Sequence, residues 1–209
     1  MSILIIGDLH LNSYSNKYLQ SQLKLINNII EYSSCYNIVF LGDIFHYRNP
    51  KAIEIIEFDK LLKSHPHKQF ILLRGNHDTT ERSDSNKTIL EVFVNNHIKV
   101  ITESRVELGY YFIPHYESED KIRLSIDEAE HKEVIGIIGH FGCKGFHSLE
   151  GYDYEGISKN LFTIPTILGH IHTFWQENNL TILGVPYSTS FAEAVANTNN
   201  NRYFMEVDR

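Results

Sequence analysis

Residues 3–10 read ILIIGDLH, an apolar run that ends in a glycine, an aspartate and a histidine. The same pattern returns in IVFLGDIFH at residues 38–46 and in FILLRGNHD at residues 70–78. Short runs rich in Ile, Val, Leu and Phe that stop at glycine or a polar residue are typical of buried strands. Each of these three strands is therefore expected to carry polar side chains, of the kinds that bind metals, just past its carboxyl end.

Helical patterns separate the three strands, over residues 18–32 and 52–63. The first pattern carries apolar side chains at the spacing of one helical face, on Leu19, Leu23, Ile26 and Ile30. We interpret this face as core, with a homodimer contact as the alternative. The alternation of strand and helix predicts a βαβαβ unit with parallel strands and right-handed crossovers, which places the strand ends together at one edge of a sheet.

Five further apolar runs predict strands in the rest of the chain, at residues 110–113, 134–138, 164–168, 182–185 and 203–207. The polar region 117–132 is predicted to be a surface helix or an excursion, and the polar stretch 79–87 is predicted to be a loop. No linker or repeat is visible in the sequence. We therefore expect an α/β fold in a single domain over residues 1–209.

The composition limits the classes of protein to which the chain can belong. With 42% hydrophobic and 22% charged residues, it is typical of a globular protein. A net charge of −7 argues against a protein that holds nucleic acid by one broad basic face. It does not exclude a nuclease, because bound divalent cations reverse the local charge where a phosphate group sits.

Three features lead us to expect a cytoplasmic protein. The two cysteines, Cys35 and Cys143, cannot form a disulfide framework and suit a reducing compartment. No stretch approaches the roughly 18 apolar residues of a membrane span, so no membrane contact is expected. The apolar run at the N-terminus is broken by Asp8 and has no basic residue before it, unlike a signal peptide.

Two more motifs follow later strands, Gly139-His140 and Gly169-His170-Ile171-His172. The five motifs together supply nitrogen and oxygen donors and no thiolate: Asp8, His10, Asp43, Asn76, His140, His170 and His172. Seven such donors are too many for one tetrahedral ion and too hard a set for a structural zinc held by cysteines. Two ions that share one carboxylate fit better, and such pairs, about 3.5–4 Å apart, promote in-line displacement at phosphorus.

The D-x-H and H-x-H pairs add a geometric expectation. On an extended segment the side-chain period is two, so both side chains of a pair point the same way. Each pair is therefore expected to supply two ligands to neighbouring positions.

The motif series GDxH, GDxx, GNHD, GH and GHxH is complete and in order from residue 7 to residue 172, and it resembles that of the calcineurin-like metallophosphoesterases. The resemblance implies a two-sheet β-sandwich flanked by helices, in four αββα layers. It implies that one ion is held by Asp8, His10, Asp43 and His172, and that the other is held by Asp43, Asn76, His140 and His170. Asp43 is then the bridge. Ligand chemistry and resemblance together favour Mn²⁺, and Fe, Zn, Ni or Co also suit these donors.

The second motif, at residues 42–46, indicates which subgroup of the superfamily the chain resembles. Serine/threonine phosphatases of this superfamily carry GDxxDRG, whereas GDIFH at residues 42–46 lacks the Asp-Arg-Gly. It resembles the SbcD-like DNA repair exonucleases, including the recombination nuclease subunits of tailed phages. Gly184-Val185-Pro186 is similar to the Gly-x-Pro segment that follows GHxH in those nucleases. The resemblance implies a Mn-dependent DNA exonuclease or endonuclease acting in DNA repair, recombination or phage DNA metabolism, in a bacterial or phage-infected cell.

The same resemblance bears on partners. SbcD-like nucleases usually continue into a capping domain and then into a segment that docks a coiled-coil ATPase of the SbcC type. The chain stops at Arg209, soon after the last motif, so no capping domain is expected and an SbcC-type partner stays an open question. An uncapped site keeps open a phosphodiesterase or phosphatase that acts on small nucleotides or other phosphate esters. A noncatalytic scaffold is a third alternative, against which the intact ligand set argues.

Three residues are candidates for catalysis beside the metals. His77 is expected to stabilise or protonate the leaving oxygen, and Asp78 to orient His77 by accepting a ring N–H. His46 is a candidate for contacting phosphate or assisting His77, with a loop histidine of no chemical role as the alternative. The sequence identifies no substrate-binding residues.

Other polar residues are weaker candidates. His115 and His147 follow motif strands and are candidates for lining the cleft, although a structural role is favoured for both. A second set can contact phosphate near the metals, although each is more often an ordinary surface charge: Arg48, Arg74, Arg82 and Lys144.

Overall fold

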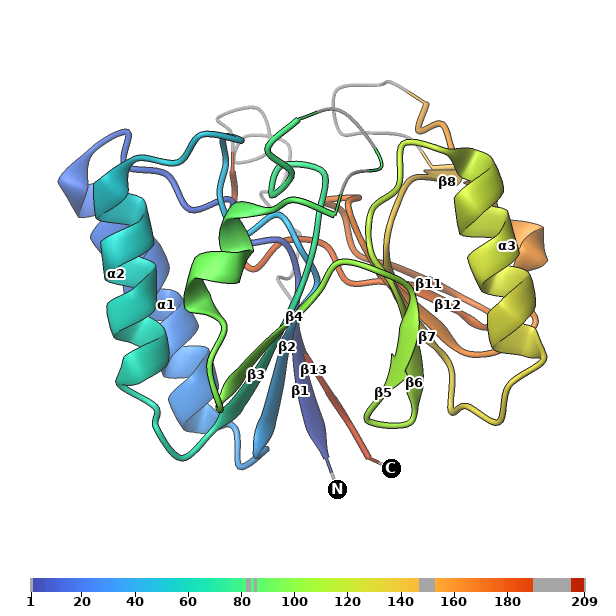
Figure 1. The fold of residues 1–209 in the computed structure, drawn as a ribbon, viewed down its shortest axis with the longest axis horizontal. Coiled ribbons are helices and arrows are strands. Elements are labelled where there is room, and N and C mark those ends of the chain that lie inside the picture. The colour runs from blue at the N-terminus through green and yellow to red at the C-terminus, as the bar shows by residue number, and fades with distance from the viewer. Residues whose placement is uncertain (1, 82–83, 85, 147–152, 190–203, 209) are drawn as a thin grey trace.

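Two β-sheets pack face to face, and helices cover both outer faces (Figure 1). The computed structural model describes residues 2–81, 84, 86–146, 153–189 and 204–208. Helices α1 (Asn16–Tyr32) and α2 (Ala52–Lys63) lie on the first sheet, and α3 (Glu119–Glu130) lies on the second. The predicted α/β sandwich of four αββα layers is therefore confirmed.

The first sheet has the strand order β13-β1-β2-β3-β4. Four strands run parallel, namely β1 (Ile3–Ile6), β2 (Asn37–Phe40), β3 (Gln69–Leu73) and β4 (Ile98–Ile101). Strand β13 (Phe204–Val207) runs antiparallel beside β1. The first three strands and both intervening helices lie where the alternation predicts them. The apolar pattern does not predict β4, because Lys99 interrupts its short run.

The second sheet has the strand order β11-β12-β10-β7-β6-β5. Its inner strands are parallel: β12 (Leu180–Ile182), β10 (Thr166–Gly169), β7 (Ile137–His140) and β6 (Tyr110–Ile113). The outer strands β11 (Trp175–Glu177) and β5 (Arg105–Glu107) run antiparallel to their neighbours. Four short elements lie outside both sheets: β8 (Cys143–Lys144), β9 (Ile157–Ser158) and the 3₁₀ helices η1 (Ile89–Phe93) and η2 (Lys159–Leu161).

The second sheet departs from the sequence prediction in two ways. The strand predicted at residues 134–138 instead spans Ile137–His140, and the N–H of Ile135 bonds to the carbonyl of Gly109 before the strand begins. The strand predicted at residues 182–185 instead ends at Ile182 and forms a hairpin with β11. That hairpin turns at Asn178, where φ is 50°, and the β5–β6 hairpin turns at Leu108-Gly109, where φ is 50° and 80°. Asn and Gly favour such turns, so they were the available signal for both hairpins.

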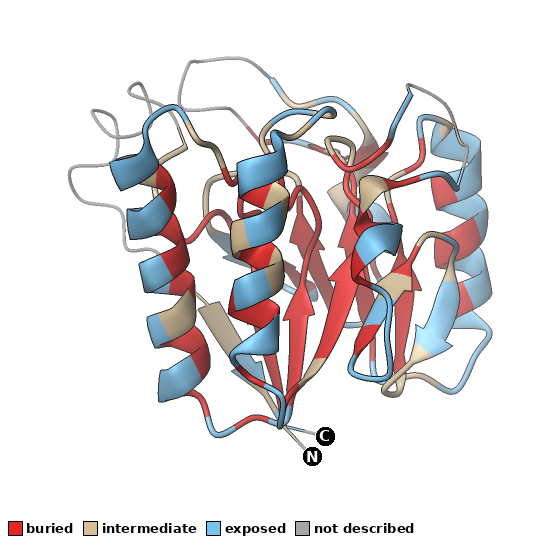
Figure 2. Cartoon of the chain, turned by 60° about the vertical axis from the view of Figure 1, so that its left-hand side comes forward, coloured by how far each residue is buried: buried red, intermediate tan, exposed pale blue. Residues whose placement is uncertain are grey.

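The inner strands of the sheets are buried on both faces, which explains why they read as continuous apolar runs (Figure 2). In β1, Leu4 and Ile6 pack toward α1 and α2, whereas Ile3 and Ile5 pack between the sheets. The apolar face predicted for α1 also packs into the cluster beneath the helices. This double burial fixes the positions of the strand ends, and therefore of the loops that follow them.

Helix α3 confirms the surface-helix reading of residues 117–132. The hydroxyl of Ser118 accepts a hydrogen bond from the N–H of Lys121 and caps the helix. Ile122 and Ile126 are buried against the second sheet. Within the described ranges, no helix has the length and apolar character that crossing a membrane requires.

Candidate metal centre

The predicted ligands meet at one edge of the sandwich. They lie in the loops after β1, β2 and β3 of the first sheet and after β10 of the second, and His140 is the last residue of β7. Their side chains form three groups whose ligand atoms lie within 4.8 Å of one another: Asp8 with His10 and His172, His10 with Asp43 and His77, and Asp43 with His140 and His170. Both sheets therefore contribute to one shared centre.

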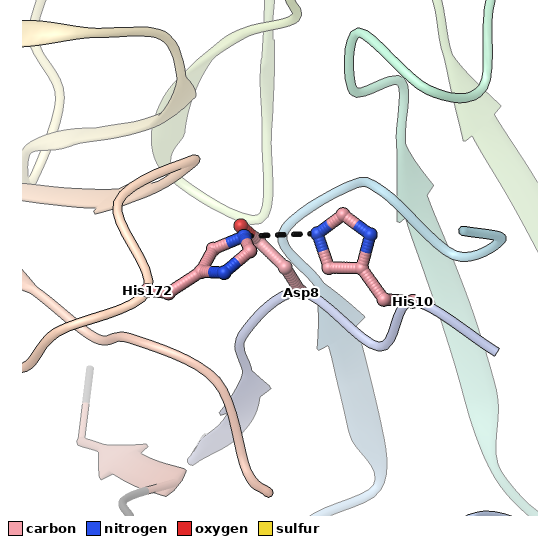
Figure 3. A group of neighbouring side chains, drawn as sticks. All are labelled: Asp8, His10 and His172. Carbon is pink, nitrogen blue, oxygen red and sulfur yellow. Dashed lines mark hydrogen bonds between the residues drawn. The ribbon is translucent and has the colours of Figure 1, made fainter. Parts of the chain in front are cut away.

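The first group joins Asp8, His10 and His172 (Figure 3). Nε2 of His10 lies 3.0 Å from Nε2 of His172. Asp8 is fully buried, and its Oδ2 accepts the backbone N–H of His170 at 2.7 Å. Its Oδ1 has no hydrogen-bond partner among the described residues. Nε2 of His10 also lies 3.6 Å from Oδ2 of Asp43, which links this group to the next.

The group around Asp43, His140 and His170 also includes Asn76. Oδ1 of Asp43 lies 3.4 Å from Nε2 of His140. Oδ1 of Asn76 lies 3.1 Å from that same nitrogen and 2.9 Å from Nδ1 of His170. Nδ1–H of His140 donates to the carbonyl of Leu41 at 2.7 Å, which leaves the Nε2 lone pair facing the centre. The two oxygens of Asp43 therefore face different groups.

These contacts fit two cations better than a network of hydrogen bonds. A pair of facing imidazole nitrogens can share one proton at most, and the buried Oδ1 of Asp8 meets no donor within the described chain. The amide oxygen of Asn76 faces two ring nitrogens. Atoms with lone pairs thus converge on both sides of Asp43, which is the donor arrangement of a dinuclear site with a bridging carboxylate.

Burial sets the protonation of the imidazole ligands. It lowers the pKa of His10 and of His170 to about 3, so both rings are neutral at pH 7 and offer a lone pair. Burial also raises the pKa of Asp8 to about 6. At His140 burial opposes the charged form, but the carboxylates of Asp43 and Asp8 outweigh it and raise the pKa to about 10. These carboxylates attract positive charge, which a proton or a metal cation can supply.

Left-handed backbone conformations turn several ligands into the centre. The φ angle is 44° at His10, 47° at Asp43 and 77° at His170. Such conformations cost about 1–3 kcal/mol each and cluster at functional sites. Neither pair is extended throughout, because His10 and His170 are left-handed. Asp8 and His10 nevertheless lie in one group, as the D-x-H spacing predicts, whereas the prediction for the H-x-H pair is wrong. The turn at His170 separates the H-x-H side chains, so that His170 joins the group of Asp43 while His172 joins that of Asp8.

His77 lies on the open side of the centre, with 36% of its side chain exposed. Its Nδ1–H donates to the backbone carbonyl of His46 at 2.5 Å, and its Nε2 lies 4.0 Å from Oδ2 of Asp43. The backbone N–H of His77 donates to Oδ1 of Asp43 at 2.8 Å. The ring of His46 is half-buried, with its centroid 5.6 Å from that of His10 and 6.1 Å from that of His77.

The structure contradicts the orienting role predicted for Asp78. Its carboxylate is buried and accepts the backbone N–H of Ile44 at 3.0 Å and of Gly75 at 2.9 Å. Burial raises its pKa to about 7. Asp78 therefore ties the loop after β3 to the loop after β2, and the carbonyl of His46 orients the His77 ring in its place.

One further residue reaches the centre, and a second one holds it in place. The ring of His115 lies 6.1 Å from that of His170 and 6.3 Å from that of His140, between centroids. Arg74, expected at the surface, is fully buried, because its Nη2 donates to the carbonyl of His115 at 2.5 Å and its carbonyl accepts the N–H of His115 at 2.9 Å. Both residues follow buried strands, as the metal motifs do, and that position was the signal for them. Arg82 and His147 lie outside the described residues.

Comparison with known proteins places the chain in a family. No curated protein matches the sequence. Among solved structures, the crystal structure of Pseudomonas putida nuclease MPE matches with 17% identity and a TM-score of 0.47; the match covers 82% of this chain and 62% of that one. The chain thus spans 62% of the length of that nuclease. The family model of the calcineurin-like phosphoesterases matches residues 1–174, where all five motifs lie. This chain therefore belongs to the calcineurin-like phosphoesterases.

Proposed function

We propose that the protein is a Mn²⁺-dependent nuclease of the SbcD type, which hydrolyses phosphodiester bonds of DNA in repair, recombination or phage DNA metabolism. One observation carries the proposal: the two oxygens of Asp43 face separate ligand groups, with the partly exposed His77 beside them. A bridged pair of cations with a neighbouring imidazole suits displacement at phosphorus. The GDIFH motif at residues 42–46, similar to that of SbcD-like nucleases, supports DNA as the substrate.

Seven side chains are proposed to hold the ions. One ion takes Asp8, His10, Asp43 and His172, and the other takes Asp43, Asn76, His140 and His170. When bound, the two cations neutralise phosphate oxygens and lower the pKa of bound water. Mixed nitrogen and oxygen donors suit Mn²⁺, which is the proposed working ion, and they also accept Fe, Zn, Ni or Co.

His77 is proposed to act on the leaving oxygen. Its Nδ1–H is held by the carbonyl of His46, so Nε2 is the nitrogen directed toward Asp43 on the open side. In the imidazolium form, Nε2–H stabilises the charge that develops on the leaving oxygen and can transfer a proton to it. His46 then positions His77 through its main-chain carbonyl. Asp78 positions His77 indirectly, because it holds the loop after β3 against the loop after β2.

The net charge of −7 predicts weak binding of DNA by this chain alone. A coiled-coil ATPase of the SbcC type, or a second copy of the chain, is proposed to add the contacts that DNA needs. The same charge favours a second candidate function, a phosphodiesterase that acts on small nucleotides, for which a broad basic surface is unnecessary.

The test compares Mn²⁺-dependent cleavage of end-labelled single- and double-stranded DNA with cleavage of a panel of small phosphodiesters. It uses the wild type, His77→Ala and the matched control His131→Ala, which removes an exposed histidine at the end of α3. We expect DNA cleavage by the wild type and the control, and a loss of about 100-fold or more in His77→Ala. Metal content, measured on the same samples, is expected to be equal in all three.

Other outcomes separate the alternatives. Cleavage confined to the small esters would favour the second candidate function and leave the metal centre in place. An absence of phosphoester hydrolysis with every one of Mn²⁺, Fe²⁺, Zn²⁺, Ni²⁺ and Co²⁺ would contradict the proposal as a whole.

A further inference from the structure

Arg48 and His115, which are outside the ligand set, face the same carboxylate at the edge of the metal centre. Nη2 of Arg48 lies 3.9 Å from Oε1 of Glu117, and Nε2 of His115 lies 3.8 Å from that oxygen. Arg48 follows β2 in the first sheet, and His115 follows β6 in the second. Two nitrogen donors from opposite sheets therefore converge on one anionic group.

His115 presents ring nitrogens that the described part of the chain leaves without hydrogen bonds. Both Nδ1 and Nε2 are buried and have no hydrogen-bond partner there. The ring stacks on that of His170, at an interplanar angle of 25°, and meets that of His140 edge-on. A buried N–H without an acceptor is unfavourable, so an anionic oxygen placed beside this ring gains a hydrogen bond that the protein itself does not satisfy.

Both donors are held in place by their surroundings. The paired hydrogen bonds with Arg74 fix the main chain of His115 against the end of β3. Nη1 of Arg48 donates to the hydroxyl of Thr79 and, at 3.3 Å, to the carbonyl of Glu81. Anchored by one nitrogen, the guanidinium keeps Nη2 directed toward Glu117, and such a pre-oriented fork suits phosphate.

Glu117 holds its position weakly. Its two contacts, at 3.8 and 3.9 Å, exceed hydrogen-bond length, and 45% of its side chain is exposed. Its backbone is fixed, because the N–H of Glu117 donates to Oδ1 of Asp84 at 2.8 Å. The carboxylate can therefore leave the two donors through side-chain rotation alone, without a change in the loop.

We propose that Arg48 and His115 form a subsite for a substrate phosphate next to the one that is cleaved, and that Glu117 occupies this subsite until that phosphate displaces it. The inference rests on the proposed function and deepens it. The subsite selects substrates with consecutive phosphodiesters, as in an oligonucleotide, over esters with a single phosphate. Glu117 acts as an internal anion that weakly bound or singly charged esters do not displace.

The test measures kcat/KM with Mn²⁺ for a thymidine trinucleotide, which has two phosphodiesters, and for the dinucleotide, which has one. The readout is the ratio of the two values. We expect Arg48→Ala and His115→Ala to lower the ratio about tenfold, and Glu117→Gln to raise it severalfold. Arg48→Lys keeps the charge without the fork and is expected to fall between Arg48→Ala and the wild type.

Matched controls make the same changes of charge elsewhere. Arg123→Ala removes an exposed arginine of α3, and Glu107→Gln removes a carboxylate at the end of β5 that is paired with Lys99. Both are expected to keep the wild-type ratio. A ratio unchanged in Arg48→Ala, Arg48→Lys and His115→Ala, with both substrates cleaved, would overturn the subsite and leave the proposed function standing. A lowered ratio in Glu117→Gln would contradict the proposal that the substrate phosphate displaces Glu117 from the subsite.

A binding measurement separates failure of the subsite from failure of the proposed function. Fluorescence anisotropy of a labelled 12-nucleotide thymidylate, in EDTA, reports affinity without metal-dependent cleavage. We expect Arg48→Ala to weaken this affinity and Glu117→Gln to strengthen it. Those opposite shifts would support the subsite even if the wild type cleaved neither nucleotide, whereas equal affinities of all variants would overturn it.

Discussion

The two sheets contribute differently held halves to the metal centre. The loops after β1 and β2 are joined through their main chains, because the N–H of His10 donates to the carbonyl of Asp43 at 2.8 Å and that of Leu11 to the carbonyl of Ile44 at 2.9 Å. The buried carboxylate of Asp78 adds the loop after β3 to this set. The first-sheet half is therefore a rigid frame in which no ligand atom is needed to connect the loops.

The ligands of the second-sheet half contact this frame through their own atoms, beside the paired hydrogen bonds between His115 and Arg74. The backbone N–H of His170 donates to the carboxylate of Asp8, and the ring of His140 donates to the carbonyl of Leu41. The ring of His172 faces that of His10, where one proton at most can join two nitrogens. We therefore expect the frame to depend less on bound metal than the loop of His170 and His172 does.

Asp43→Asn breaks the junction between the halves and is expected to have the largest effect. The amide keeps one oxygen and replaces the other with an NH₂ group, which cannot bridge two cations. We expect loss of at least one bound metal and a fall in phosphodiester hydrolysis of about 10³-fold, equivalent to roughly 4 kcal/mol. Metal content and Mn²⁺-dependent turnover measure both. Asp127→Asn on the exposed face of α3 is the matched control, and retention of two ions by Asp43→Asn would exclude a bridging role.

Removal of metal tests the difference directly. We expect Mn²⁺ at about 100 times its Kd to stabilise the fold by about 2.7 kcal/mol, which raises Tm by roughly 5–10 °C. Hydrogen exchange with Mn²⁺ and with EDTA locates the effect. Chelation is expected to speed exchange in residues 170–174 more than in residues 8–11 and 43–46. Equal acceleration in both halves would show that the frame also depends on metal.

Asp78→Asn tests what holds the frame, with a smaller expected effect. One of the two backbone N–H groups would face an NH₂ group, so we expect a loss of about 1–3 kcal/mol in the free energy of unfolding. Chemical denaturation measures it, with Asp127→Asn again as the control. Full stability combined with a large loss of turnover would instead favour the orienting role that the sequence suggests for Asp78.

The same contrast explains what the sequence could predict. The frame can be predicted from the sequence. The strict alternation of apolar strands and amphipathic helices places β1, β2 and β3 correctly, and the motifs mark the carboxyl ends of these strands. In the second sheet, short edge strands such as β5 and β11 carry polar residues on exposed faces, so apolar runs did not reveal them. All seven predicted ligands nevertheless meet. The type of a ligand and its position at the end of a strand are local properties, which a sequence pattern can predict.

The hydrogen-bond partners of individual side chains are not local properties, so the sequence pattern does not predict them. The left-handed turn at His170 is stabilised by Asp8, which is distant in sequence, so a period-two rule could not predict it. The sequence around Arg74 favours an ordinary surface charge, yet Arg74 is buried, and the carbonyl of His115 after β6 accepts a hydrogen bond from its guanidinium. Asp78 likewise follows the His77 that it was expected to orient but bonds to the neighbouring loops. Spacing identified the chemistry, whereas tertiary contacts assigned the roles.

His46→Ala is expected to have the smallest effect. It tests whether the frame acts on His77 through the main chain of His46 or through its ring. If the frame orients His77 through the main-chain carbonyl of His46, loss of the imidazole leaves that hydrogen bond intact. We therefore expect turnover within about threefold of the wild type, which is about 0.7 kcal/mol in the barrier, and an unchanged metal content. His77→Ala, assayed beside it, is expected to lose about 100-fold or more. A loss in His46→Ala equal to that in His77→Ala would show that the His46 ring takes part in catalysis. The frame would then contribute a side chain to the reaction and not only the main-chain carbonyl that orients His77.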